Sequence, residues 1–171
     1  MIRRYALTRA AFAFAVACFL ISCATEEKAP PPAFGAQITP TGGSAIKGRV
    51  AFAQVDSGVV MLVNLGGGGQ GSWRIVIHAT GICTSPNGFS AGPPVMLPGT
   101  TTPAMASVIV NSDKSIGQIS TRLPGLALNG PQGIVGKSVV VHLAQGSLEA
   151  EPGVPNNRVA CGVIEPMAPM F

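Results

Sequence analysis

Short segments rich in valine, isoleucine and alanine, separated by turn residues, dominate the chain from residue 46 onward. Glycine, proline, asparagine and aspartate stand between these segments, as in Asp56-Ser57-Gly58. Such residues interrupt regular structure, whereas β-branched residues favour strands. No stretch after the first 22 residues shows helical periodicity. The pattern therefore predicts an all-β domain, a sandwich or a barrel. The expected strands are Gly48–Gln54, Gly58–Leu65, Trp73–His78, Ala106–Val110, Ile116–Thr121 and Ser138–His142.

The first 22 residues have the composition of an export signal. Three arginines precede the apolar run Ala10–Ile21, which is too short to be a comfortable membrane span. The run ends in Leu20-Ile21-Ser22-Cys23, which resembles the lipobox of bacterial lipoproteins. That resemblance implies cleavage before Cys23 and a lipid on its thiol. An ordinary secretory peptide that contains a cysteine is the alternative.

Net charge excludes one class of partner. The chain carries a formal charge of +4, and removal of residues 1–22 with their three arginines leaves +1. The basic character therefore belongs mostly to a segment that we expect to be discarded. No basic patch with interleaved aromatic residues is present either, so we expect no nucleic-acid partner.

Residues 23–45 are predicted to be the lipidated cysteine followed by a flexible tether. The charged cluster Glu26–Lys28 precedes Pro30–Pro32, and Thr39–Gly43 adds further turn residues. A stretch of this composition buries too little apolar surface to fold alone. We therefore place one domain at residues 46–165 and a loosely ordered tail at residues 166–171.

Four cysteines are present, and their positions favour one disulfide. Cys18 leaves with the signal and Cys23 is the lipid acceptor, so Cys83 and Cys161 remain. Two cysteines in an exported chain are expected to pair, the alternative being two free buried thiols. The loop would span 78 residues (161 minus 83), for which chain entropy gives roughly 4–5 kcal/mol of stabilisation.

Two parts of the domain carry a more specific resemblance. The first is Ile77–Ser85 (IHATGICTS), followed by Ser90–Pro94 (SAGPP). The second is Ile134–His142 (IVGKSVVVH), followed by Arg158–Ile164 (RVACGVI). In this order they resemble the copper/zinc superoxide dismutases. The resemblance implies an eight-stranded Greek-key β-barrel, and it places Cys83 and Cys161 at the family's disulfide positions.

The same resemblance assigns the metal positions and shows that most ligands are missing. His78 and His142 match copper ligands, whereas Val76 and Pro94 stand where the family has the other copper ligand and the bridging histidine. The remaining zinc positions fall near Thr102–Met105, and no His, Asp, Glu or Cys occurs from residue 88 to residue 106. Because a zinc site needs about four such ligands, we expect no zinc.

We expect no cofactor, with copper at His78 and His142 as the alternative. Three methionines, Met61, Met96 and Met105, are soft ligands that suit copper(I); the alternative role for them is core filling.

Arg158 matches the family's arginine that guides the superoxide anion, and would act in catalysis only in an active enzyme. Its alternative role is a structural hydrogen bond to carbonyl groups near the disulfide.

Three functions follow as hypotheses. The first is a lipid-anchored, superoxide dismutase-like protein of the bacterial cell envelope, on its periplasmic or surface face, without ordinary dismutase activity and with a binding or structural role. The second is a copper-dependent dismutase with a reduced site, and the third is a copper buffer or chaperone. Fold alone decides none of them. The expected partners are the membrane, through the lipid on Cys23, and a second copy of the chain; no protein partner is identified.

The lipobox makes a direct prediction about anchoring. Cys23→Ser removes the only thiol that can carry the lipid, so the variant should leave the membrane fraction or accumulate uncleaved. Cell fractionation and the mass of the N-terminal peptide measure both outcomes. A Cys23→Ser protein that is cleaved and stays in the membrane fraction would contradict the lipobox assignment.

Overall fold

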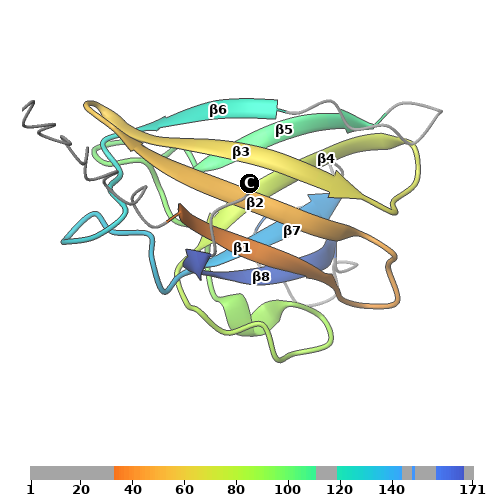
Figure 1. Cartoon of the computed structure of the whole chain (residues 1–171). Coiled ribbons are helices and arrows are strands. Elements are labelled where there is room, and N and C mark those ends of the chain that lie inside the picture. Colours follow the sequence, from red (N-terminus) through yellow and green to blue (C-terminus); the bar gives the residue numbers. More distant parts are fainter. Residues whose placement is uncertain (1–32, 111–118, 144–147, 149–156, 168–171) are drawn as a thin grey trace, which may run out of the picture.

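The computed structural model describes residues 33–110, 119–143, 148 and 157–167 (Figure 1). Antiparallel β-strands and their connections make up nearly all of this part, with one short 3₁₀ helix, η1 (Phe89–Ala91). Within these ranges no helix has the length and apolarity required to cross a bilayer. The strands are β1 (Ala33–Pro40), β2 (Lys47–Val55), β3 (Gly58–Gly66), β4 (Gly71–His78), β5 (Met105–Val110), β6 (Ile119–Pro124), β7 (Ser138–Leu143) and β8 (Arg158–Met167).

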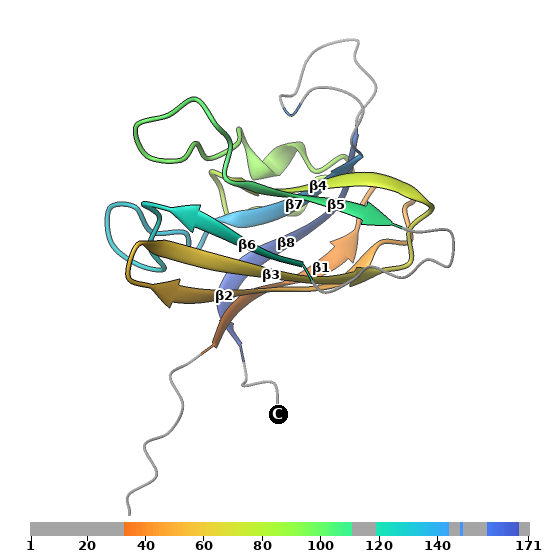
Figure 2. The same cartoon turned by 90° about the horizontal axis from the view of Figure 1, so that it is seen from above.

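The eight strands form one antiparallel sheet that curls into a nearly closed barrel (Figures 1 and 2). Their order is β5-β4-β7-β8-β1-β2-β3-β6, so β5 and β6 are the two edges. The chain passes from β3 to β4 and from β6 to β7 without pairing these strands, which gives the Greek-key crossings. The predicted Greek-key β-barrel is confirmed.

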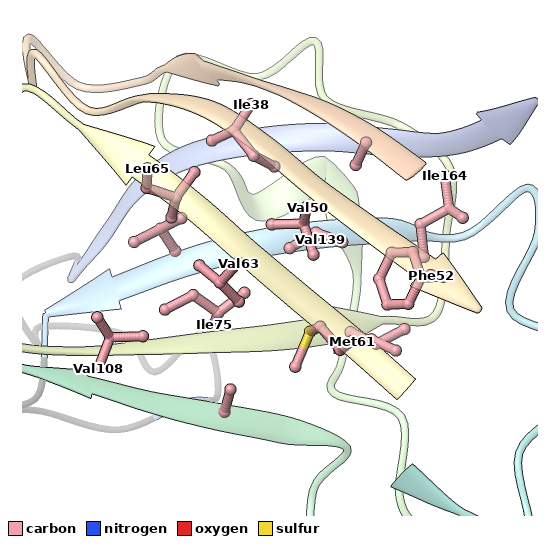
Figure 3. Close-up of a cluster of buried hydrophobic side chains, with 14 of the residues drawn as sticks. Ile38, Val50, Phe52, Met61, Val63, Leu65, Ile75, Val108, Val139 and Ile164 are labelled. Carbon is pink, nitrogen blue, oxygen red and sulfur yellow. The ribbon is translucent and has the colours of Figure 1, made fainter. Parts of the chain in front are cut away.

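Alternation along each strand directs one set of side chains into the barrel. Val50 and Phe52 of β2 and Met61 and Val63 of β3 point inward and are buried, and β4 contributes Ile75 (Figure 3). Apolar residues at every second position are what a strand with one face on a core requires. The interior is therefore filled with aliphatic side chains, and it holds no charged residue among those described.

Strands β4 and β7 differ because both of their faces are covered. Residues 138–142 of β7 are all buried, as are residues 75–78 of β4. The inner face packs into the barrel, and the outer face lies beneath the long connection from β4 to β5, residues 79–104 (Figure 2). This two-sided burial explains the uninterrupted apolar run in β7, and it creates the enclosed space in which the candidate site lies.

The predicted tether of residues 23–45 is wrong over its second half. Ala33–Pro40 forms β1, which pairs with both β2 and β8 at the centre of the sheet order. Ala36 and Ile38 are fully buried. The error has a physical cause: proline and glycine on either side masked the short period-two alternation, and pairing to two neighbouring strands outweighs weak local propensity. The first part of the predicted tether, residues 23–32, lies outside the described residues.

The domain also ends later in the chain than predicted. Strand β8 continues to Met167, two residues into the predicted tail, because Ala33 pairs with Met167 and Phe34 with Pro166. Strand β6 covers Ile119–Pro124 instead of residues 116–121, of which residues 116–118 lie outside the described part. The other five expected strands agree with the observed ones to within two residues at each end.

The predicted disulfide is present. Cys83, in the connection after β4, is bonded to Cys161 in the middle of β8, and their Cα atoms are 5.7 Å apart. Cys161 is fully buried and packs with Ala91 and Val140 on the outer face of the sheet. The bond therefore fixes the covering connection to the strand beneath it.

The position of β1 predicts where the folding unit begins. A chain that starts at Ile46 lacks β1, leaves β2 and β8 as unpaired edges, and should aggregate or fail to melt cooperatively. A chain that starts at Pro31 should melt cooperatively, as measured by thermal and urea unfolding. Within the full barrel, Ile38→Ala should cost about 2–5 kcal/mol, whereas the exposed neighbour Gln37→Ala should cost no more than about 0.5 kcal/mol. Equal stability of the two shortened chains would contradict a structural role for β1.

Candidate functional site

The candidate site lies on the outer face of the sheet, where β4 and β7 are adjacent. His78 of β4 and His142 of β7 both point away from the barrel core and are fully buried. In the β4–β7 ladder, His78 is opposite Ser138 and His142 is opposite Arg74. The Val76–Val140 pair lies between these two positions, so each imidazole must extend along the sheet to reach the other.

The two imidazole rings meet beneath the covering connection. Their Nε2 atoms are 3.0 Å apart, and the rings stack with centroids 5.1 Å apart and an angle of 15° between their planes. Pro94 of the covering connection forms a bridge with His78. The structure thus brings together the two histidines that the family resemblance selects, although 64 residues separate them in the sequence.

An oxygen atom faces the second nitrogen of each ring. His78 Nδ1 is 2.7 Å from the carbonyl oxygen of Gly92, and His142 Nδ1 is 3.1 Å from Oδ1 of Asn157. The side-chain amide of Asn157 donates through Nδ2 to the Leu143 carbonyl, which assigns Oδ1 to the histidine side. Both oxygens are acceptors, so each Nδ1 is placed to carry a proton.

The neutral histidine pair has one proton fewer than its hydrogen-bond contacts require. Two neutral imidazoles carry two protons, but the network has three contacts: the Gly92 carbonyl, the contact between the rings, and Asn157 Oδ1. If both Nδ1 atoms donate, two Nε2 lone pairs face each other. If one ring takes the other tautomer, an Nδ1 contact loses its hydrogen. A third proton or a bound cation between the rings would satisfy all three contacts.

Burial opposes the third proton. The pKa of His78 falls from 6.5 to about 4, chiefly because the ring is removed from water; the bond to the Gly92 carbonyl opposes this fall, and the positive charge of Arg158 adds to it. Burial likewise lowers the pKa of His142 from 6.5 to about 3, against a smaller opposing effect of Asn157. At neutral pH both rings are therefore uncharged.

Arg158 lies beside the pair, at the start of β8, and is only 2% exposed. Its Nη1 donates to the carbonyls of Gly88 (3.1 Å) and Gly92 (3.2 Å), and its Nη2 donates to the carbonyl of Leu148 (3.1 Å). The guanidinium also lies over the Phe89 ring, 5.3 Å from its centroid. In this arrangement Arg158 holds the covering connection in place, and the expected role in anion guidance stays a prediction.

Two glycines allow this close approach. Gly88 has φ of +69° and Gly92 has φ of +75°, in the left-handed region that glycine tolerates best. A Cβ atom on Gly88 would lie 3.2 Å from Cβ of Arg158. The small residues at both positions therefore let main-chain carbonyls reach the guanidinium.

The two substituted copper positions are beside the histidines. Val76 is fully buried on the same outer face, and Pro94 is the residue that bridges to His78. Neither side chain has a lone pair to offer a metal. Among the described residues, no group of three or more His, Cys, Asp or Glu side chains is close enough to hold a metal ion. The donors present therefore do not fit the four-ligand copper site or the zinc site that the resemblance implies.

The three methionines are not gathered at the histidine pair. Met61 lies inside the barrel core (Figure 3), and Met96 is 41% exposed in the covering connection. Met105 begins β5, opposite Val76 in the ladder. Met61 therefore fills the core. Of the three methionines, only Met105 is paired in the sheet with Val76, a residue of the outer face.

Asn157 is the residue of the site that sequence reasoning missed. It is next to Arg158 in the chain, and it orients His142 from the start of β8. A single asparagine gives no pattern of its own in the sequence. Its adjacency to Arg158 is the one signal that pointed to this position.

The sequence of the barrel matches that of a known protein family. Residues 46–164 match the family model for copper/zinc superoxide dismutase (SODC). The match covers more than half of the chain, so the chain belongs to this family. No curated protein matches it closely enough to count as a relative.

The buried pair predicts a pH-dependent stability. Because the folded pKa values lie below the unfolded value of 6.5, the unfolded state binds more protons under acidic conditions. Stability should be full above about pH 6.5 and should fall as the pH drops towards about 4. At about 1.4 kcal/mol for each pKa unit, the loss should reach about 3 kcal/mol or more. Urea unfolding at a series of pH values measures it.

His78 and His142 are the only histidines of the chain, which supplies a control. The double variant His78→Leu/His142→Leu should lose this decline between about pH 6.5 and about pH 5, where carboxylates contribute little. The same slope in the parent and the double variant would show that the pair does not titrate as described.

Proposed function

We propose that this member of the copper/zinc superoxide dismutase family is an exported, lipid-anchored envelope protein without ordinary dismutase activity, and that its role is binding or structural. One observation carries the proposal. The two lost copper positions, Val76 and Pro94, lie directly beside His78, where they supply apolar packing instead of ligands. The family's metal site has become part of the packing between the sheet and its cover.

Dismutation requires a centre that changes oxidation state and a group that delivers protons to the product. In the family the bridging histidine joins these two tasks, and Pro94 has no proton to give. Arg158 directs three hydrogen bonds at main-chain carbonyls and is almost fully buried. Both features support a site that holds the barrel and its cover together without turnover.

A second candidate function is copper(I) handling, and the proton count favours it. The histidine Nε2 atoms face each other, and each Nδ1 has an oxygen acceptor; metal-binding histidines are commonly oriented in this way, with the nitrogen that does not bind the metal donating to an oxygen. His78 and His142 would hold the ion, whose contribution would be a soft positive charge between two neutral rings. The two Nε2 atoms are 3.0 Å apart, which is less than the length of two metal–nitrogen bonds of about 2.0 Å each. The rings would therefore have to move apart to hold an ion between them.

The decisive experiment measures copper stoichiometry and superoxide removal on the same samples. The mature parent, loaded with excess copper, should remove superoxide at least about a thousandfold more slowly than the limit of about 10⁹ M⁻¹s⁻¹ that diffusion-limited enzymes reach. His78→Ala and His142→Ala should leave that background unchanged. Fast turnover that disappears in both variants would restore the enzyme hypothesis.

A variant that restores ligands makes the comparison sharper. Val76→His/Pro94→His adds two imidazoles next to His78, so it should bind copper(II) at least about tenfold more tightly than the parent. One equivalent of copper(I) in the parent, lost in His78→Ala and in His142→Ala without turnover, would select copper handling. Folded proteins with neither copper nor activity would leave the binding or structural role.

A further inference from the structure

A cavity of about 400 Å³ opens at one end of the barrel. It lies where the β1–β2 and β3–β4 connections meet the end of β7 and the start of β8, on the right of Figure 1. The histidines lie on the outer face of the sheet, apart from the cavity; the lining residue Leu143 contacts their network through its main chain, which is hydrogen-bonded to Asn157. The mouths of β-barrels are places where small-molecule sites recur, and the volume falls within the usual range of about 300–1,000 Å³.

The lining of the cavity is uncharged and mostly apolar. Leu143 and Val159 contribute apolar side chains, Ile46 and Trp73 lie beneath with 3% and 2% of their surface exposed, and Ser44 and Gln70 are the polar residues of the lining. Transfer of a charged ligand to such surroundings is costly unless it is paired. The cavity therefore selects a neutral molecule with an apolar body.

One wall is bare main chain. Residues 67–69 are three consecutive glycines, and a Cβ atom on Gly68 would lie 2.0 Å from Cζ2 of the Trp73 indole. Gly68 thus allows the loop to pack flat against the ring. Among the described residues, the N–H groups of residues 67–69 donate to no other main-chain carbonyl. They are available to a ligand that carries a hydrogen-bond acceptor.

We infer that this barrel-end cavity binds a small neutral molecule that combines an apolar ring with a carbonyl-type acceptor. The ring packs against Leu143 and Val159, over the nearly buried edges of Ile46 and Trp73, and the acceptor faces the glycine wall. This inference does not depend on the state of the histidine pair, and it goes beyond the function proposed above. It assigns the proposed binding role to a site separate from the histidine pair.

The test uses Prodan, a neutral naphthyl ketone whose emission shifts to the blue in apolar surroundings. Trp73 is the only tryptophan in the chain and lines this cavity, so its fluorescence gives a second readout of binding. We expect saturable one-to-one binding with a Kd of about 10–500 µM, in line with the affinity of small ligands of this size. Blue-shifted Prodan emission and quenching of Trp73 should follow one binding curve.

Two glycine variants separate the cavity from the nearby surface. Gly69 lines the cavity and Gly66 does not, yet a Cβ atom meets nothing within 4 Å at either position. Gly69→Leu should weaken Prodan binding at least about tenfold, and Gly66→Leu should leave it within about twofold of the parent. Leu143→Ala, which removes a wall side chain that is 43% exposed, should weaken binding without loss of the fold. Binding that never saturates, or that is equal in the parent, Gly69→Leu and Leu143→Ala, would overturn the inference.

Discussion

The Gly92 carbonyl is the acceptor on which the outer face of this barrel depends. It accepts a hydrogen bond from Arg158 Nη1 at 3.2 Å and faces His78 Nδ1 at 2.7 Å. One main-chain oxygen thereby joins the covering connection to β4 and to β8. Loss of this acceptor would leave the buried Nδ1 of His78 without its oxygen partner and would remove one of the hydrogen bonds of Arg158. The Cys83–Cys161 bond fixes the same connection a few residues away.

By the family resemblance, two of the copper-ligand positions of this chain hold histidines and two hold Val76 and Pro94. His78 and His142 are still oriented from behind by oxygen atoms, as metal ligands are. Val76 is buried on the same face, and Pro94 forms a bridge with His78. The result is a neutral pair that has three contacts but only two protons. A third proton or a bound cation would satisfy the remaining contact.

Much of the fold was predictable because strand signals in this chain are local. Alternation in β2 and β3 and the turn residues between them placed these strands almost to the residue. β1 was missed because its pairing partners, β2 and β8, include one that lies more than a hundred residues away in the chain. Such long-range pairing leaves little trace in local composition. The histidine pair came from the family motifs, whereas Asn157 and the Gly92 carbonyl emerged only from the three-dimensional arrangement, since a main-chain oxygen has no sequence signature.

The pairing of Ala33 with Met167 places both ends of the described barrel at one pole. The glycine-walled cavity lies at the opposite pole, beyond the far ends of β1 and β3 (Figure 1). If the chain is anchored through Cys23, the lipid is joined to the domain at the pole where β1 begins. The point of attachment and the mouth of the cavity are then at opposite ends of the barrel.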